Sequence, residues 1–455
     1  MHEFIRSLYG ARKVILRESP RPITPFGGLA LLGEFLRRLQ FPAVVQTALP
    51  FTLTSPNAIP PAETFTAFIF AVVAGAQRFA HTQLLRADRA LHAVLGLTRF
   101  PGDDTFRHFF RRFGLPQVNA FFDALSRWQL ARLPGRASGY TLDLDSTLFT
   151  RYGRQEGARK GFNPRRPGGV VHHPLLAVLA EAHFVLHAWL RSGNARASRG
   201  AVEFLREAFA RLPAHVHLRC LRADSGFFEN GLLSFLEERA VPYLIVARRT
   251  HGLKRLLAQV AAWTAVDADR AVSELTVQLW GWSVPRRFLL IRERLQEPVS
   301  TRQRLLFDVP GYVIRLLVTN RTEDVLTLWQ DYHQRATMEQ CIRELKDDLG
   351  AAGFCMHPFF PTEAAFRSVL FVYNLLGEFQ RTCGLTTWHQ PATLRHTVFL
   401  CGALLGRSGR RWVLQLSRSW GGLTPRKPLL DRLRQPPDPT APKLPADPSG
   451  ALALT

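Results

Sequence analysis

The sequence predicts an α/β protein in which a helical region precedes a sheet-containing core, and a β-rich segment interrupts that core. Three observations support this fold class. Apolar residues recur at spacings of three and four up to about residue 135, as in amphipathic helices. Strand-like and helix-like segments then alternate from residue 136 to about 395, as in α/β sheets. Within this core, residues 250–320 consist mainly of alternating, β-branched segments, which we interpret as an insertion.

The N-terminal region contains five segments with a helical pattern. They cover residues 29–39, 62–78, 83–97, 105–113 and 117–132. Asp104 follows a Pro-Gly turn and is expected to cap the fourth segment. That segment, TFRHFFRRF, is both basic and aromatic. It fits either a DNA-reading helix that uses Arg107, Arg111 and Arg112, or a helix whose phenylalanines at helical spacing lie in a core.

The first strand of the core carries two carboxylates on one face. Residues 140–149 alternate as YTLDLDSTLF, so Asp143 and Asp145 point to the same side. Two like charges placed together are costly unless a cation lies near them. A long basic connection follows, and its Arg159, Lys160, Arg165 and Arg166 fit either a DNA contact or a solvated loop.

The core continues with strands over residues 170–180, 184–190, 216–221 and 242–247, and helices over 198–212 and 229–239. Asp224 follows the strand 216–221, where active-site groups of α/β sheets often lie. His172 with His173, and His215 with His217, fit metal ligands, but fifteen histidines make chance pairs common and structural roles more frequent. In the insertion, Trp280 and Trp282 fit core packing or base stacking.

Residues 331–349, DYHQRATMEQCIRELKDDL, are expected to form one helix. One narrow stripe of this helix holds a phenol, a carboxylate and three cations: Tyr332, Arg335, Glu339, Arg343 and Lys346. A second stripe is apolar. An ordinary amphipathic helix with a charged face explains the segment when it is taken alone, whereas the upstream aspartates favour a functional role.

The C-terminal part is expected to be helical and then disordered. Helical patterns cover residues 363–382 and 394–404, and we assign 396–420 to a C-terminal helical segment. From residue 421 to 455 the high proline content predicts a disordered tail.

Composition limits the class of partner. The net charge is +23 and is spread through foldable sequence, which indicates a polyanionic partner such as nucleic acid. We expect residues 1–135 to form a helical DNA-binding domain. Five scattered cysteines without a Cys-x-x-Cys motif disfavour a disulfide framework or structural zinc. The start lacks a signal-peptide pattern, and the apolar run 65–76 is too short to cross a bilayer. We therefore expect a soluble, cytoplasmic protein.

Asp145, Asp224 and Glu339 are far apart in the sequence but lie on elements that can meet in one site. Three acidic side chains so placed suit two Mg²⁺ or Mn²⁺ ions about 3.5–4 Å apart, the arrangement used for phosphodiester displacement. Cations beside Glu339 would then hold phosphates. Asp143 shares a face with Asp145 and is the alternative acid.

Three motifs resemble a DDE-type transposase of bacterial insertion sequences, in the group with a Tyr-Arg-Glu-Lys signature. Tyr332, Arg335, Glu339 and Lys346 follow one another at intervals of three, four and seven residues. Asp145-Ser146-Thr147 and Asp224-Ser225-Gly226 are similar to the first and second acid motifs. The basic connection leading into HHPLLA also resembles the thirteen-eighty family of the insertion sequence four superfamily. The resemblance covers about residues 85–385, whereas PGDDTFRHFF departs from the Ser-rich version expected there.

The resemblance implies an RNase H-like catalytic core, Mg²⁺-dependent cut-and-paste transposition, and DNA phosphate contacts from Tyr332, Arg335 and Lys346. It also implies terminal inverted repeats and target DNA as partners, two protomers on paired ends, and association with the bacterial nucleoid when DNA is bound. Two alternatives remain open. One is a nuclease or resolvase of the same fold that cuts without joining, and the other is a DNA-binding protein derived from a transposase.

Overall fold

The computed structural model describes residues 4–9, 12–55, 57–97, 99–161, 163, 166–248, 250, 253, 260, 262–294 and 312–435. Arg165, which we expected to contact DNA, and residues 436–455 of the expected tail lie outside these residues. No helix in the described part of the chain is long and apolar enough to span a membrane.

One nine-stranded sheet runs through the middle of the molecule, in the order β12-β13-β14-β15-β11-β10-β4-β8-β9. β10 pairs in parallel with β4 and β11, and the other neighbours are antiparallel. The strands are β4 (Tyr140–Ser146), β8 (Leu175–Leu179), β9 (Phe184–Trp189), β10 (Leu218–Ala223), β11 (Tyr243–Val246), β12 (Thr264–Ala265), β13 (Arg270–Val277), β14 (Arg286–Arg294) and β15 (Tyr312–Thr319).

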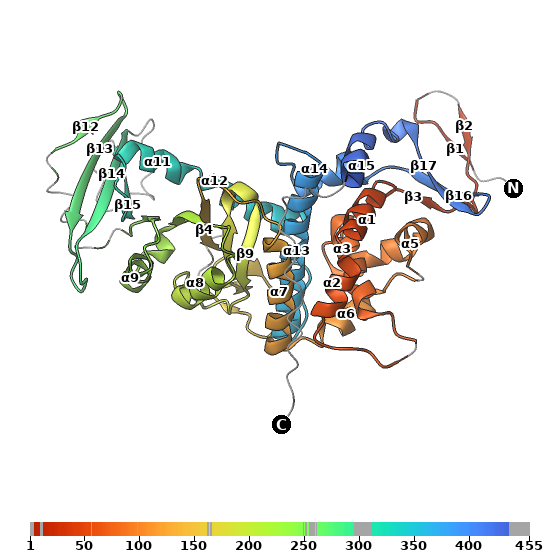
Figure 1. Ribbon diagram of the computed structural model, residues 1–455, viewed down its shortest axis with the longest axis horizontal. Coiled ribbons are helices and arrows are strands. Elements are labelled where there is room, and N and C mark those ends of the chain that lie inside the picture. Colours follow the sequence, from red (N-terminus) through yellow and green to blue (C-terminus); the bar gives the residue numbers. More distant parts are fainter. Residues whose placement is uncertain are drawn as a thin grey trace.

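The β-rich insertion is a continuation of this sheet. β15 pairs with β11 on one side and with β14 on the other. The insertion strands extend away from the rest of the molecule (Figure 1). Trp282 packs on Phe228 and Phe288, with ring centroids 5.5 and 6.0 Å away, so this tryptophan has a core role. Trp280, two residues earlier, is fully exposed.

Helices cover both faces of the sheet. α8 (Ala201–Ala210) and α9 (Asn230–Glu238) bury Phe204, Leu205 and Leu233 against β4, β10 and β11. On the other side, α13 (Phe359–Thr382) contacts β9 and also α7 (Leu115–Leu130). α13 is buried along nearly all its length between the sheet and the N-terminal helices (Figure 1). Its buried residues include polar ones, such as Glu363 and Arg367, which pair with each other.

From residue 29 the N-terminal region is helical, as the residue periodicity predicts. Its first residues instead contain the short strands Phe4–Arg6, Lys13–Ile15 and Ile23–Thr24, and the helix Phe41–Ala48 was not expected. Its helices are α1 (Leu29–Arg38), α2 (Phe41–Ala48), α3 (Pro61–Val73), η1 (Phe79–Thr82), α4 (Gln83–Arg86), α5 (Arg89–Leu95), α6 (Asp103–Phe110) and α7. The expected helix 83–97 is broken at Asp88, whose carboxylate accepts from the Leu91 amide and the Thr24 hydroxyl. Asp104 lies in the first turn of α6, and Gly102 occupies the N-cap.

α6 buries its three phenylalanines. Phe106, Phe109 and Phe110 belong to the core that α3 and α13 also share. Phe68 of α3 lies 5.0 Å from Phe110 and 4.9 Å from Phe354 between ring centroids. The core-packing interpretation of TFRHFFRRF therefore accounts for its aromatic face, and its arginines are left on the other side.

The expected C-terminal helical segment 396–420 is wrong over most of its length. After the short α14 (Pro391–Leu394) and the π-helical turn η6 (Arg395–Phe399), β16 (Ala403–Ser408) and β17 (Arg411–Leu416) form a hairpin. β16 also pairs with β3 (Ile23–Thr24). The helical pattern misled because an apolar run fits either element, and the pairing partner is about 380 residues away.

The expected disorder from residue 421 is also wrong for α15 (Lys427–Arg434). Leu429 and Leu433, four residues apart, are buried in the same core as α1. Pro428 lies in the first turn, where the missing amide hydrogen is no loss. The remaining short strands are β1 (Phe4–Arg6), β2 (Lys13–Ile15), β5 (Phe149–Thr150), β6 (Arg159–Lys160) and β7 (Val170–His172).

Candidate active site

Asp145 and Asp224 lie at the carboxyl ends of two adjacent strands. Leu144 of β4 is in register with Ala223 of β10, so the next residue of each strand falls at the same edge of the sheet. Asp224 ends its strand by accepting a hydrogen bond from the Gly226 amide at 2.9 Å. Asp224 is close enough to Asp145 for its charge to contribute to the raised pKa of the Asp145 carboxyl.

Asp145 is a partly buried acid held by an arginine. Its side chain is 15% exposed and pairs with Arg335, with 2.9 Å between Nη2 and Oδ2. The Ser146 amide donates to Oδ1 at 2.7 Å. Burial raises the pKa of Asp145 to about 6 despite the opposing charge of Arg335, and the nearby Asp224 raises it further. Asp145 is thus an acid whose negative charge the protein only partly compensates.

Asp143, two residues earlier on the same face, is buried, which raises its pKa, but an arginine holds both its oxygens. Both its oxygens accept from Arg222 of β10, at 2.7 Å from Nε and 2.8 Å from Nη2, and neither residue is appreciably exposed. Burial alone would lower the pKa of Arg222, but its hydrogen bonds to Asp143 outweigh burial and raise it. The cation that we expected near the two aspartates of β4 is therefore, at Asp143, the guanidinium of Arg222.

Arg222 also connects Asp143 to the segment that carries the Tyr-Arg-Glu-Lys signature. Its Nη1 donates to the Asp331 carbonyl at 2.5 Å, and the Asp331 carboxylate accepts from Arg219 and Arg321. Asp331 precedes Tyr332 near the end of α11 (Val325–His333). Sequence reasoning missed this network. Its one sequence signal is Arg222, which shares a strand face with the candidate acid Asp224.

The expected helix 331–349 is three elements. α11 ends at His333, α12 (Ala336–Arg343) begins after Arg335, and the π-helical turn η5 (Glu344–Asp348) follows. The break occurs because Asp331 is drawn into the arginine network and Arg335 turns toward β4, where it also donates to the Leu144 carbonyl at 3.3 Å. Its Nε atom is buried, with no hydrogen-bond partner among the described residues.

Glu339 is not gathered with the two aspartates. It is exposed on α12 and lines a groove of about 500 Å³ together with Trp329, Tyr332, Arg335 and residues of β15. Across the described residues, no group of three or more His, Cys, Asp or Glu side chains is close enough to hold a metal ion. The structure thus brings together Asp145, Asp224 and Arg335, and it places Glu339 beside the groove, on the helix that begins directly after that arginine.

The other signature residues lie around this edge. The Tyr332 phenol is largely buried, which raises its pKa to about 12. Lys346, on η5, places its Nζ 3.2 Å from the Leu148 carbonyl and 3.4 Å from the Thr147 hydroxyl, just past Asp145. Arg343 is exposed, as are Arg159 and Lys160 of β6. The Arg166 guanidinium lies 5.3 Å from the Tyr152 ring centroid.

The histidine pairs have hydrogen-bond partners of their own. His172 accepts from Arg151 at Nδ1 and contacts the Glu156 carbonyl through Nε2, and burial lowers its pKa to about 4. His173 contacts the Ala195 carbonyl and the Ser146 hydroxyl. His215 contacts the Leu133 carbonyl. A structural role accounts for these three residues, and His173 additionally fixes the residue next to Asp145.

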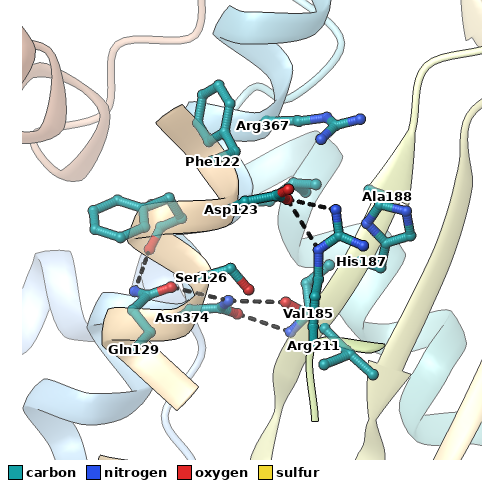
Figure 2. Close-up of a pocket in the computed structure, with 13 residues that line it drawn as sticks. Phe122, Asp123, Ser126, Gln129, Val185, His187, Ala188, Arg211, Arg367 and Asn374 are labelled. Carbon is teal, nitrogen blue, oxygen red and sulfur yellow. Dashed lines mark hydrogen bonds and ion pairs between the residues drawn. The ribbon is translucent and has the colours of Figure 1, made fainter. Parts of the chain in front are cut away.

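A separate small cavity contains none of the predicted site residues. Figure 2 shows it between α7, β9 and α13, where Asn374 exchanges two hydrogen bonds with the backbone of Val185 and Arg211 pairs with Asp123. Its volume of about 50 Å³ is suited to one or two water molecules. We regard it as part of the joint between the helices and the sheet.

Comparison with known proteins assigns the class. The chain falls in the class of proteins with a DDE transposase domain. It belongs to the family described as Transposase DDE domain group 1, whose model matches residues 6–437. No curated protein matches the chain. A solved structure with some similarity is a piggyBac transposase synaptic complex with hairpin DNA, at 11% identity and a TM-score of 0.45, covering 84% of this chain and 83% of that one.

Proposed function

We propose that the protein is a DNA transposase that cleaves DNA at the ends of an insertion sequence and joins the freed 3′ ends to target DNA by a cut-and-paste route. The observation that carries the proposal is the pair of carboxylates, Asp145 and Asp224, at adjacent strand ends, with Arg335 in contact with one of them. Family membership supports the class of reaction.

The carboxylates fit a divalent cation. Oxygen donors are the ligands that Mg²⁺ and Mn²⁺ prefer, and the raised pKa of Asp145 marks a charge that a cation would stabilise. We propose that Asp145, Asp224 and Glu339 hold two such ions, with Glu339 approaching from α12. When bound, the ions supply activation of the attacking oxygen and stabilisation of the leaving oxygen. Asp143 is not proposed as a ligand, because Arg222 occupies both its oxygens.

The cations around the acids would bind the DNA backbone. The Nε atom of Arg335 has no partner among the residues that the structure describes, so it is a hydrogen-bond donor that a phosphate oxygen could use. Tyr332 and Lys346 flank the acids, and exposed Arg343 extends the same helix face. Arg159, Lys160 and Arg166 are proposed to contact DNA from the hairpin, as is Arg165.

We further propose that the strands β4, β8, β9, β10 and β11 form an RNase H-like core, and that the chain belongs to the Tyr-Arg-Glu-Lys group of the insertion sequence four superfamily, near the thirteen-eighty family. Its partners would be terminal inverted repeats and target DNA, bound by two protomers on paired ends. The motif spacing supports this finer assignment.

The acids are tested by replacing them without changing their shape. Asp145→Asn, Asp224→Asn and Glu339→Gln are each expected to abolish Mg²⁺-dependent cleavage of DNA that carries the element ends, while binding of the same DNA persists. Mg²⁺ is expected to raise the melting temperature of the unmodified protein but not of Asp145→Asn or Asp224→Asn. Glu203→Gln, an exposed carboxylate on α8, is the matched control.

Joining is tested separately. Pre-cleaved ends and supercoiled target DNA should give integrants with the unmodified protein, whereas a nuclease of the same fold would give none. Full cleavage by any of the three variants would remove that residue from the proposed site. Loss of Mg²⁺ stabilisation in Asp143→Asn alone would transfer the ligand role to Asp143.

A further inference from the structure

A second groove, of about 470 Å³, lies between the start of η1, α6, the segment 150–155 that follows the Asp145 strand, and the loop 350–355. None of the described residues that line it is acidic. Its charged lining residues are the cations Arg78, Arg107, Arg151 and Lys346. Tyr152 and Gln155 also line it. A hollow with four positive charges and no compensating carboxylate in its described lining attracts a polyanion.

Two of these cations point into the groove without a carboxylate partner among the described residues. Arg78 is exposed at the start of η1. The Arg107 guanidinium lies over the Phe79 ring, 4.9 Å from its centroid, so the ring supports it while its N–H groups stay available. Arg107 is the residue of α6 that faces this groove, since the phenylalanines of the same helix are in the core.

The floor of the groove is built by close backbone contact. Gly350 and Gly353 lie against Gln77, and a Cβ on Gly353 would come within 2.0 Å of the Gln77 carbonyl oxygen. The Gln77 side chain donates to the Asp347 carbonyl at 2.5 Å, and Arg151 donates to the Ala352 carbonyl. The groove is therefore preformed, with little freedom for its walls to move apart.

The groove is continuous with the candidate active site. Lys346 lines it and also reaches Thr147 and Leu148, the residues that follow Asp145 and Ser146 on the chain. Tyr152 is 85% exposed and offers a flat ring to a base or sugar. The Oε1 atom of Gln155 is buried without a hydrogen-bond partner among the described residues and can accept a base amino group.

We propose that this groove binds the sugar-phosphate backbone of the DNA strand next to the phosphate that is cleaved, with Arg78 and Arg107 contacting successive phosphates. The proposal rests on the proposed function, because it places the strand relative to Asp145. It assigns α6 a backbone-positioning contact, which depends on charge and not on DNA sequence.

The test measures how DNA affinity falls with salt, using the full chain and a labelled mixed-sequence duplex in EDTA, so that no cleavage occurs. Each phosphate contact contributes about 0.9 to the slope of log affinity against log salt concentration. Arg78→Ala with Arg107→Ala should lower the slope by about two. Arg78→Lys with Arg107→Lys should restore it, because lysine keeps the point charge. Arg239→Ala, an exposed arginine at the end of α9, should leave it unchanged.

An unchanged slope in a double alanine variant that melts at the temperature of the unmodified protein would overturn the groove assignment. So would an equal loss in the lysine variant, since that would indicate a packing role for these arginines. The outcome is independent of catalysis. If the slope falls in the double alanine variant but the unmodified protein fails to cleave DNA in Mg²⁺, the proposed function fails and the groove assignment stands. If the unmodified protein cleaves DNA but its slope equals that of the double alanine variant, the groove assignment fails and the proposed function stands.

Discussion

At the scale of single residues, two aspartates on one strand face differ because different arginines hold them. Asp143 has both oxygens paired with Arg222, whereas Asp145 has one contact with Arg335 and a neighbour of like charge in Asp224. The sequence shows that both acids share a face, but it leaves their partners open, because Arg222 and Arg335 are 79 and 190 residues further along the chain. The raised pKa of Asp145 has a measurable effect on stability.

Asp145→Asn is expected to stabilise the metal-free protein at neutral pH. A carboxyl whose pKa rises from 3.8 to about 6 on folding binds its proton more tightly in the folded state. Its cost to folding is absent at low pH, grows as the pH rises from about 4 to about 6, and is complete above that. Denaturation in EDTA should give a stability difference between variant and unmodified protein of roughly 1–3 kcal/mol at pH 7 that vanishes near pH 4.

The pH trend identifies the cause. Glu203→Gln, which replaces an exposed carboxylate, should change stability little at any pH. A pH-independent difference for Asp145→Asn would mean that the effect comes from packing and not from the charge of the acid.

At the scale of elements, the sequence predicts which helices and strands form better than it predicts where each of them begins and ends. The strand that bears Asp143 and Asp145, the turn after β10 and the helices of the N-terminal region follow from short-range periodicity. The position of the break between α11 and α12 does not, because it depends on Asp331 meeting Arg219 and Arg222, which lie 112 and 109 residues earlier in the chain. The β16–β17 hairpin was missed for a similar reason, since its third strand, β3, lies near the start of the chain.

The contact of the 350–353 loop with Gln77 provides an element-scale prediction. Gly353→Ala should destabilise the protein by roughly 1–3 kcal/mol, because the added methyl group meets the Gln77 backbone and the loop must move away. Gly231→Ala is the matched control, since that glycine is on the exposed side of α9 with no atom nearby, and alanine should add up to about 1 kcal/mol. Denaturant titration of both variants measures the difference. Equal stabilities would show that the loop is not held against η1.

At the scale of the whole molecule, the N-terminal helices and the sheet share a core. Phe371 of α13 lies 5.9 Å from Phe41, 6.0 Å from Phe65 and 6.2 Å from Trp128, measured between ring centroids. The same core includes Val185 of β9 and Leu433 of α15. Sequence patterns place a boundary near residue 135, yet the apolar contacts of the folded chain cross it.

Phe371→Ala is therefore expected to weaken both sides of that boundary together. The cost should be roughly 3–5 kcal/mol, the range for removing a buried phenylalanine. Hydrogen exchange should show amides of α2, α3 and β9 losing protection by a similar factor. Trp280→Ala, which removes a fully exposed ring, should alter none of them. Loss of protection confined to α2 and α3 would mean that the helices and the sheet unfold as separate units.

The shared core also affects how the protein is made. Phe65 leaves the ribosome about 300 residues before Phe371, an interval of roughly 15–60 s at the usual speed of protein synthesis. Throughout that interval the part of the N-terminal core that packs on α13 remains uncovered, so newly made chains are expected to depend on chaperones until synthesis is nearly complete.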